Sequence, residues 1–156
     1  MKRNLLIILL LALVVTGCET IPKSTKTPLE LQAIQSKEFE TSKKVAFAAT
    51  LSVFQDVGYT INSASLETGL ITAKSPTKGD YVLFIGQRMK DVKATAFVEE
   101  ISPNRTKIRV SLVNSTETSN DYGMKGGHEY PEETPEVYQD IFAKVQQAIF
   151  VRKNIQ

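Results

Sequence analysis

The sequence has few of the residue types that catalysis and covalent bracing need. Among its 156 residues, Cys18 is the only cysteine and His128 the only histidine. A single cysteine excludes a disulfide within the chain, and no G-x-S-x-G motif marks a nucleophilic serine. Because candidate acids, bases and nucleophiles are so scarce, we expect no enzymatic activity, no cofactor and no metal.

An excess of positive charge is also missing. The 19 basic and 17 acidic side chains give a net charge of +2, and Lys2 and Arg3 account for both charges. Nucleic-acid binders show a concentrated basic footprint, so we expect no nucleic-acid partner. The length of the chain suits one domain with its own hydrophobic core.

The longest hydrophobic run, Leu5 to Val15, follows two basic residues at the N-terminus. It is about half of the ~20 residues that a membrane-spanning helix needs and has the length of a signal-peptide core. The sequence Val15-Thr16-Gly17-Cys18 closes it and resembles the bacterial lipoprotein signal. The resemblance implies cleavage between Gly17 and Cys18, a diacylglycerol on the Cys18 thiol and an acyl chain on the new amine. The alternative is an ordinary secretory signal with a cysteine there by chance.

The lipoprotein signal predicts where the protein lies. Several acyl chains anchor a protein firmly, whereas one chain does so only marginally. Glu19 occupies the position where, in enteric-type lipoproteins, aspartate favours the inner membrane, so we expect the outer membrane and a domain that faces the periplasm. Residues 1–17 are then the signal peptide, residues 18–36 the lipidated cysteine and a flexible tether, and residues 37–156 one folded domain.

Periodicity along the domain predicts helices over Lys43–Val57 and from Pro135 onward, with a glycine after the first and Thr134 capping the second. Short apolar or alternating runs predict strands at Ser36–Thr41, Tyr59–Asn62, Leu70–Ala73, Lys93–Ile101 and Thr106–Asn114. A loop is expected at Pro76–Asp80, and Tyr81–Ile85 is a strand or a short helix. Short turns between strands favour an α+β fold: a two-layer sandwich with a mainly antiparallel sheet and both helices on one face (β-α-β-β-(β)-β-β-α).

Four short segments follow one another along the chain: Phe39-Glu40-Thr41, Gln55-Asp56-Val57-Gly58-Tyr59, Gly69-Leu70-Ile71-Thr72-Ala73 and Tyr138-Gln139-Asp140-Ile141-Phe142. The series resembles a group of small uncharacterised lipoproteins of Gram-negative bacteria, with the pattern F-E-T, Q-D-x-G-[FY], G-[LVI]-I-x-A and Y-Q-x-x-F. The architecture is similar, more loosely, to the helix-grip domains of the C lipoprotein of the β-barrel assembly machine. The resemblance implies an envelope lipoprotein and does not imply an activity.

Ser115–Glu133 is polar and bears glycines, and it either extends the preceding hairpin or forms a mobile loop. Long irregular segments are usually functional or disordered, and loops carry binding more often than cores do. Its contact-capable side chains, Tyr122, Met124, His128 and Tyr130, are therefore the predicted surface for an envelope protein partner. The alternative is a linker without a role.

Two functions fit these features. The first is a non-enzymatic protein-binding or assembly accessory subunit, held at the membrane through the Cys18 lipid. The alternative is a carrier of a lipid or other apolar ligand in a cavity between the helices and the sheet. A filled interface favours the first function, and a cavity of several hundred Å³ favours the second.

Other chemical interpretations have less support. A metal site would use His128, Glu129 and Asp121, whose spacing matches no common ligand pattern. The paired carboxylates Glu99 and Glu100 are neighbours on a predicted strand, so they point to opposite faces. The glycines of Gly123–Gly127 precede no phosphate-binding helix.

Overall fold

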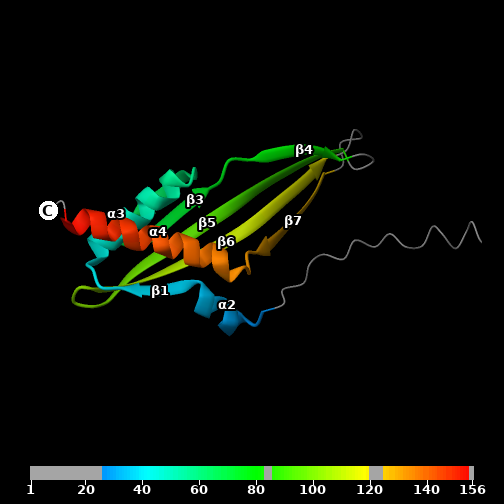
Figure 1. The fold of residues 1–156 in the computed structure, drawn as a ribbon. Coiled ribbons are helices and arrows are strands. Elements are labelled where there is room, and N and C mark those ends of the chain that lie inside the picture. Colours follow the sequence, from blue (N-terminus) through cyan, green and yellow to red (C-terminus); the bar gives the residue numbers. More distant parts are fainter. Residues whose placement is uncertain (1–25, 83–85, 120–124, 155–156) are drawn as a thin grey trace, which may run out of the picture.

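A computed structural model describes residues 26–82, 86–119 and 125–154. In this part of the chain, seven antiparallel strands form one sheet, and helices α3 and α4 lie side by side across one face of it (Figure 1). The strand order is β1-β6-β5-β3-β2, with β4 also paired to β5 and β7 also paired to β6. The expected α+β sandwich with a mainly antiparallel sheet is confirmed.

The elements are labelled as in Figure 1. In chain order they are α2 (Pro28–Ile34), β1 (Ser36–Phe39), α3 (Lys43–Asp56), β2 (Thr60–Ser65), β3 (Leu70–Lys74), β4 (Lys78–Val82), β5 (Gly86–Ser102), β6 (Arg105–Ser119), β7 (Lys125–Pro131) and α4 (Pro135–Asn154). Compared with the predicted order, the short helix α2 and the strand β7 are additional. No helix in the described ranges is both long enough and apolar enough to cross a bilayer.

The helix α3 begins and ends close to the predicted residues. Its buried side chains, which include Phe47, Val53 and Phe54, recur at helical spacing and belong to the hydrophobic core. Gly58 follows the helix at φ +87°, a left-handed conformation that glycine adopts without steric cost. The amide of Tyr59 then bonds the carbonyl of Phe54, which closes the last turn and starts β2.

The helix α4 covers the rest of the same sheet face. Pro135 occupies its first position, where the missing N–H costs nothing. Its apolar side chains at helical spacing are buried at Tyr138, Ile141, Phe142, Val145 and Ile149, whereas Val137 is 36% exposed. The ring centroids of Phe142 and Phe39 lie 6.2 Å apart, so α4 also packs onto β1.

The β5–β6 hairpin forms the centre of the sheet, and both of its strands are longer than predicted. Alternate residues on each strand, among them Ala96 and Val110, are buried beneath the helices. The first part of β6 pairs with β1, and the middle of β5 pairs with β3. The other ends of both strands run past the helices and pair with β4 and β7 (Figure 1). We call this four-stranded extension the wing: β4, residues 86–91 of β5, residues 114–119 of β6, and β7.

Two local predictions around β4 need correction. The expected loop at Pro76–Asp80 is wrong for its second half, because β4 begins at Lys78. Of the Tyr81–Ile85 segment, Tyr81 and Val82 belong to the strand, and residues 83–85 lie outside the described residues. The strand has no buried face to mark it: Lys78 to Tyr81 are all exposed.

The predicted flexible tether is also wrong at its C-terminal end. Thr27 and Glu30 form a capping box, in which the Thr27 hydroxyl accepts from the Glu30 amide and the Glu30 carboxylate accepts from the Thr27 amide. With Pro28 at the first helical position, this box starts α2. Gln35 is only 3% exposed, and its carbonyl accepts a 2.8 Å bond from the Val110 amide. The folded domain therefore begins about ten residues earlier than the tether boundary predicted.

Deleting residues 19–36 is therefore expected to lower the free energy of unfolding by about 2–4 kcal/mol. The estimate counts the hydrogen bonds of Gln35 at about 1 kcal/mol each and the packing of Ile34 against the core. Urea unfolding of the chain from Glu19 onward, with and without the deletion, measures the loss. Deleting residues 19–26 alone is the control and should be neutral. Equal stability of both deletions would show that α2 and Gln35 contribute nothing.

Candidate interaction surface

The predicted recognition segment forms most of one side of the wing. Residues 115–119 complete β6, and β7 pairs with them, so the segment extends the hairpin, which was one of the two expected forms. Tyr122 and Met124 lie outside the described residues. His128 and Tyr130 lie on β7, opposite Thr116 and Asn114 of β6. The sequence did not mark β7 as a strand, because it carries Gly126-Gly127 and has exposed side chains on both faces.

The sheet register assigns His128 and Tyr130 to the face that the helices cover elsewhere. Residues directly opposite in a sheet share a face, and residues two apart along a strand do as well. Asn114 and Thr116 follow the buried Leu112 at intervals of two, so they lie on its face, as do the residues that pair with them. The wing thus continues the core face of the sheet beyond the helices, with polar side chains in place of apolar ones.

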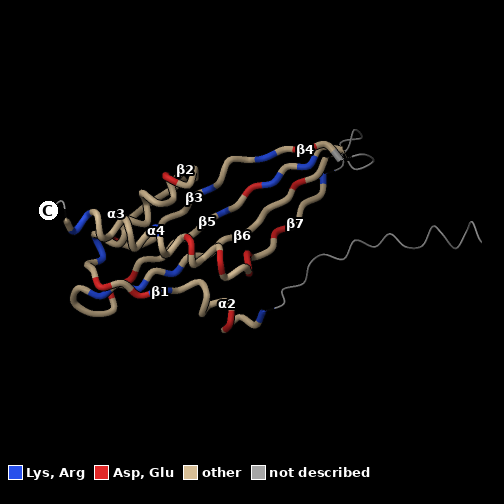
Figure 2. The backbone as a smooth tube through the Cα atoms, viewed as in Figure 1, with Lys and Arg blue, Asp and Glu red and all other residues tan. Residues whose placement is uncertain are grey.

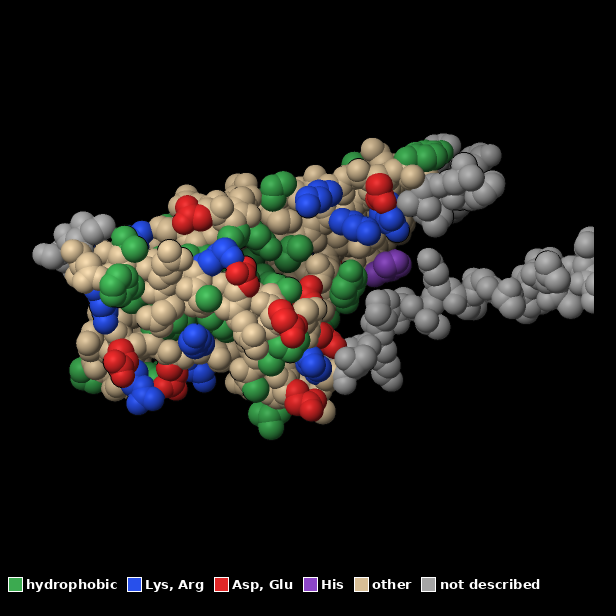
Figure 3. Space-filling model, viewed as in Figure 1, with side chains coloured by type: hydrophobic (Ala, Val, Ile, Leu, Met, Phe, Trp, Pro, Cys, Tyr) green, Lys and Arg blue, Asp and Glu red, His purple; other side chains and the backbone are tan. Residues whose placement is uncertain are grey.

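A row of basic residues crosses this face of the wing. Lys78 of β4 pairs with Lys90 of β5, Lys90 pairs with Thr116 of β6, and Thr116 pairs with His128 of β7. Because adjacent strands are about 4.8 Å apart, the two lysines are immediate neighbours. Figure 2 shows the basic positions of β4 and β5 in the wing, and Figure 3 shows basic side chains gathered beside the histidine.

The next row outward is neutral, because Arg88 pairs with Asp80 directly across the strands. Arg88 donates two hydrogen bonds to the carboxylate, at 3.1 Å from Nε and 2.5 Å from Nη2. These bonds, together with the charges of Arg88 and Lys90, hold the pKa of Asp80 below its ordinary value. Within the described ranges, neither Lys78 nor Lys90 forms an ion pair of its own.

A hollow of about 430 Å³ lies where the wing leaves the helix layer. The wing lines it with Lys78, Lys90, Thr116 and Tyr130, and Tyr59 lines it from the end of α3. Tyr59 is half-buried and stacks on Phe54 with ring centroids 5.8 Å apart. Burial and the negative charge of Glu132 raise the pKa of the Tyr59 hydroxyl, so it stays a neutral hydrogen-bond donor.

The connection from β7 to α4 holds one wall of this hollow in place. Asn114 donates a 3.1 Å bond to the Glu132 carboxylate, which also accepts from the amides of Glu133 and Thr134. Burial acts to raise the pKa of Glu132, but these hydrogen bonds outweigh burial and lower it. The Glu132 carboxylate is therefore ionised, and it is occupied by these three hydrogen bonds. The buried Tyr138 hydroxyl donates to the Glu132 carbonyl at 2.9 Å, which ties the connection to α4.

The opposite face of the wing differs, because two of its acidic side chains form ion pairs with lysines of the neighbouring part of the sheet. Lys93 lies 2.5 Å from Glu129, and Lys74 lies 2.9 Å from Asp91. Glu129 points away from His128, since adjacent strand residues face opposite sides. The metal set of His128, Glu129 and Asp121 is therefore not assembled: two members diverge, and Asp121 lies outside the described residues. In the described part of the chain, no three potential metal ligands gather.

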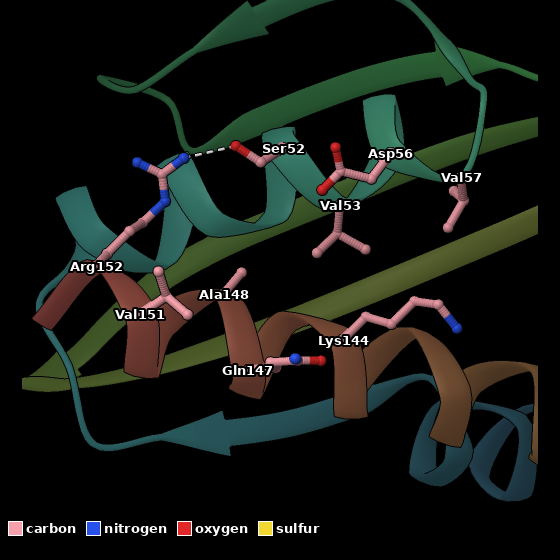
Figure 4. Close-up of a pocket in the computed structure, with 9 residues that line it drawn as sticks. All are labelled: Ser52, Val53, Asp56, Val57, Lys144, Gln147, Ala148, Val151 and Arg152. Carbon is pink, nitrogen blue, oxygen red and sulfur yellow. Dashed lines mark hydrogen bonds between the residues drawn. The ribbon is translucent and has the colours of Figure 1, made fainter. Parts of the chain in front are cut away.

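A second hollow, of about 630 Å³, runs between α3 and α4 on their outer side (Figure 4). Its apolar floor includes Val53 and Ala148, and a 2.5 Å bond from Arg152 to the Ser52 hydroxyl crosses one end of it. Only residues of α3 and α4 and Val57, which ends α3, line this groove.

Sequence reasoning missed the two lysines and Tyr59. Lys78 and Lys90 lie on separate strands, and they meet only because the β4–β5 register places them directly opposite each other. Lys90, Val92 and the buried Ala94 are spaced two apart along the strand, so they share one face of the sheet. This spacing was the available signal for the position of Lys90. The carboxylates Glu99 and Glu100 were correctly separated, since they pair with Lys107 and Thr106 on opposite faces.

Comparisons with known proteins find similarity to solved structures only. No family model matches the chain, and no curated protein matches it. Among solved structures, a TBP-like protein from Parabacteroides distasonis aligns with a TM-score of 0.39 and 16% sequence identity. That alignment covers 73% of this chain and 90% of the other.

Proposed function

We propose that the protein is a lipid-anchored envelope lipoprotein whose domain binds another envelope protein through the helix-side face of the wing. The anchor half of the proposal rests on one observation, the sequence Val15-Thr16-Gly17-Cys18 directly after a short apolar run. Cys18 would carry the diacylglycerol and acyl chains. The outer membrane, with the domain in the periplasm, is the proposed location.

The binding half rests on the wing. A sheet face that continues beyond its helices leaves the basic row and Tyr130 open to a partner, whereas the same face beneath α3 and α4 is fully used by the core. The wing also contains His128 and Tyr130, the two predicted contact residues that the structure describes. A non-enzymatic role fits this surface, because binding by a strand face needs no catalytic group.

The carrier alternative has weaker support. Among the residues that the structure describes, nineteen hydrophobic side chains form the buried core, with large ones such as Tyr138 and Phe54 fully enclosed. The hollows described above lie on the outer side of the helices and at the corner of the wing. An apolar ligand would need a cavity lined by both layers, and neither of these hollows provides one.

The anchor is tested by Cys18→Ser. A serine cannot receive the thioether-linked diacylglycerol, so the variant is expected to remain as uncut precursor without palmitate. Metabolic labelling with radioactive palmitate and fractionation of membranes measure both effects. Replacing Thr16 by alanine keeps a small residue and the thiol, and should label normally. Labelling of Cys18→Ser at the wild-type level would contradict the proposed anchor.

The binding surface is tested in cells with a photo-crosslinking amino acid in place of His128. Irradiation is expected to join the protein to a discrete envelope protein, identified by mass spectrometry. The same amino acid in place of the exposed Lys44, on α3, is the matched control and should give no such product. Equal products from both positions, or none from the wing, would contradict binding by this face.

A further inference from the structure

We propose that the corner hollow of the wing binds a carboxylate side chain of an acidic, extended segment of the protein partner, between the Lys78 and Lys90 ammonium groups. This inference rests on the proposed function and names the chemistry of its partner. The site consists of the two lysines, Thr116, Tyr59 and Tyr130, which line the hollow together. Tyr59 packs against the core through Phe54, whereas the other four side chains are exposed or only partly buried and lie outside the core cluster. Asp91 also lines the hollow, and its carboxylate lies 2.9 Å from the Lys74 ammonium group.

The first argument is the cost of the lysine pair. Like charges directly opposite in a sheet destabilise it, and Lys78 and Lys90 are directly opposite. The neighbouring cross-strand pair, Asp80 with Arg88, shows that this ribbon elsewhere uses opposite charges. Local arrangements that work against stability are expected at functional sites. An anion between the two ammonium groups removes the repulsion and replaces it with two attractions.

The second argument is the chemistry of the other walls. The Thr116 hydroxyl and the phenol of Tyr130 are available to donate hydrogen bonds to a carboxylate. Tyr59 keeps its proton, because burial raises its pKa. A volume of about 430 Å³ exceeds what a bare inorganic ion fills and is at the small end of ligand pockets. It therefore fits a side chain together with its backbone.

The third argument distinguishes a protein segment from an anionic membrane surface. The hollow lies beside acidic groups: Asp91 is part of its lining, and the charge of Glu132 acts on Tyr59. A flat anionic surface would meet these charges together with the lysines. A single carboxylate inserted between the two lysines meets an Asp91 carboxylate that Lys74 already pairs.

The test uses the full-length lipoprotein in detergent micelles and a labelled peptide of alternating glutamate and glycine. Residues two apart in an extended chain face the same side, so this peptide presents a row of carboxylates. Fluorescence anisotropy is expected to show binding that weakens with salt. Lys78→Gln with Lys90→Gln should weaken it about tenfold or more, the loss expected for charge-assisted hydrogen bonds.

Three controls make the result specific. Lys44→Gln with Lys125→Gln removes the same charge from exposed sites away from the hollow and should change affinity less than about twofold. A matched glutamine–glycine peptide should not bind. Lys78→Arg with Lys90→Arg keeps the charge and should retain most of the affinity. Circular dichroism checks that each variant is folded, and Tyr130→Phe gives a second, milder loss that does not depend on the lysines.

Each outcome bears on the proposal. Unchanged peptide affinity in the double glutamine variant, or equal loss in the control pair, overturns it. Lysine-dependent binding of phosphatidylglycerol vesicles without peptide binding assigns the site to lipid headgroups and also overturns it. Crosslinking through residue 128 separates this inference from the proposed function. If the double glutamine variant still captures the partner at full yield, the proposed function is supported and the carboxylate site is overturned. If the peptide binds but no partner is captured, the carboxylate site is supported and the proposed function is overturned.

Discussion

Replacing Phe142 by alanine is expected to lower the free energy of unfolding by about 3–5 kcal/mol. The ring is 4% exposed and packs against Phe39, so truncation leaves a cavity at the junction of α4 and β1. Stabilities of domains are about 5–15 kcal/mol, so the loss is a large share of the total. Urea unfolding followed by circular dichroism measures it on the chain from Glu19 onward.

Phe150 is the matched control for this experiment. It lies on the same helix but is 66% exposed, so Phe150→Ala should change stability by less than about 0.5 kcal/mol. A near-neutral effect at Phe142 would mean that the α4 stripe is not core, and that its aromatic face is open to a partner instead. That result would move the candidate interaction surface from the wing to the helix.

The elements that could be predicted from the sequence are those with one buried face. In α3, Phe47 and Phe54 recur at helical spacing, and Gly58 ends the helix. In β6, the buried Ile108, Val110 and Leu112 alternate with partly or fully exposed residues. Burial imposes the period of the secondary structure on the sequence, so the pattern and the structure agree there.

The wing could not be predicted for the same reason. Both of its faces meet solvent over much of β4 and β7, so no apolar period marks these strands. Their pairing is dictated by β5 and β6, which continue as a ribbon after the core ends. The basic row depends on this pairing as well: Lys78 and Lys90 become neighbours through register alone. The composition of the Ser115–Glu133 segment was therefore enough to select His128 and Tyr130 as candidate contact residues. It could not show that Lys78 and Lys90 lie beside them.

The start of the domain was misread for a different reason. Proline and small polar residues suggested a tether, yet Thr27-Pro28-Leu29-Glu30 has the spacing of a capping box with proline at the first helical position. The same residue types therefore serve a linker and a helix start. Only the contact of Gln35 with Val110 and Tyr138, distant in sequence, distinguishes the two.

Replacing Gly69 by alanine is expected to cost about 3 kcal/mol or more, and replacing Gly58 about 1 kcal/mol. Both glycines are left-handed, at φ +78° and +87°, so alanine meets similar backbone strain at each. They differ in their surroundings. A Cβ on Gly69 would lie 2.1 Å from the Val98 carbonyl oxygen, whereas nothing lies within 4 Å of one on Gly58. The pair thus separates a steric clash from backbone strain.

A small side-chain movement cannot relieve the clash at Gly69, because the Cβ would meet a backbone atom of β5. Gly69 is also held there by its own carbonyl, which accepts a 2.8 Å bond from the Val98 amide. Moving the turn away to fit a methyl group would break that bond and the start of the β3–β5 pairing at Leu70 and Phe97. Urea unfolding of the two variants under identical conditions measures the difference. Equal losses at the two positions would mean that the turn before β3 shifts freely, and that the β3–β5 register is not fixed by the close approach of Gly69 to Val98.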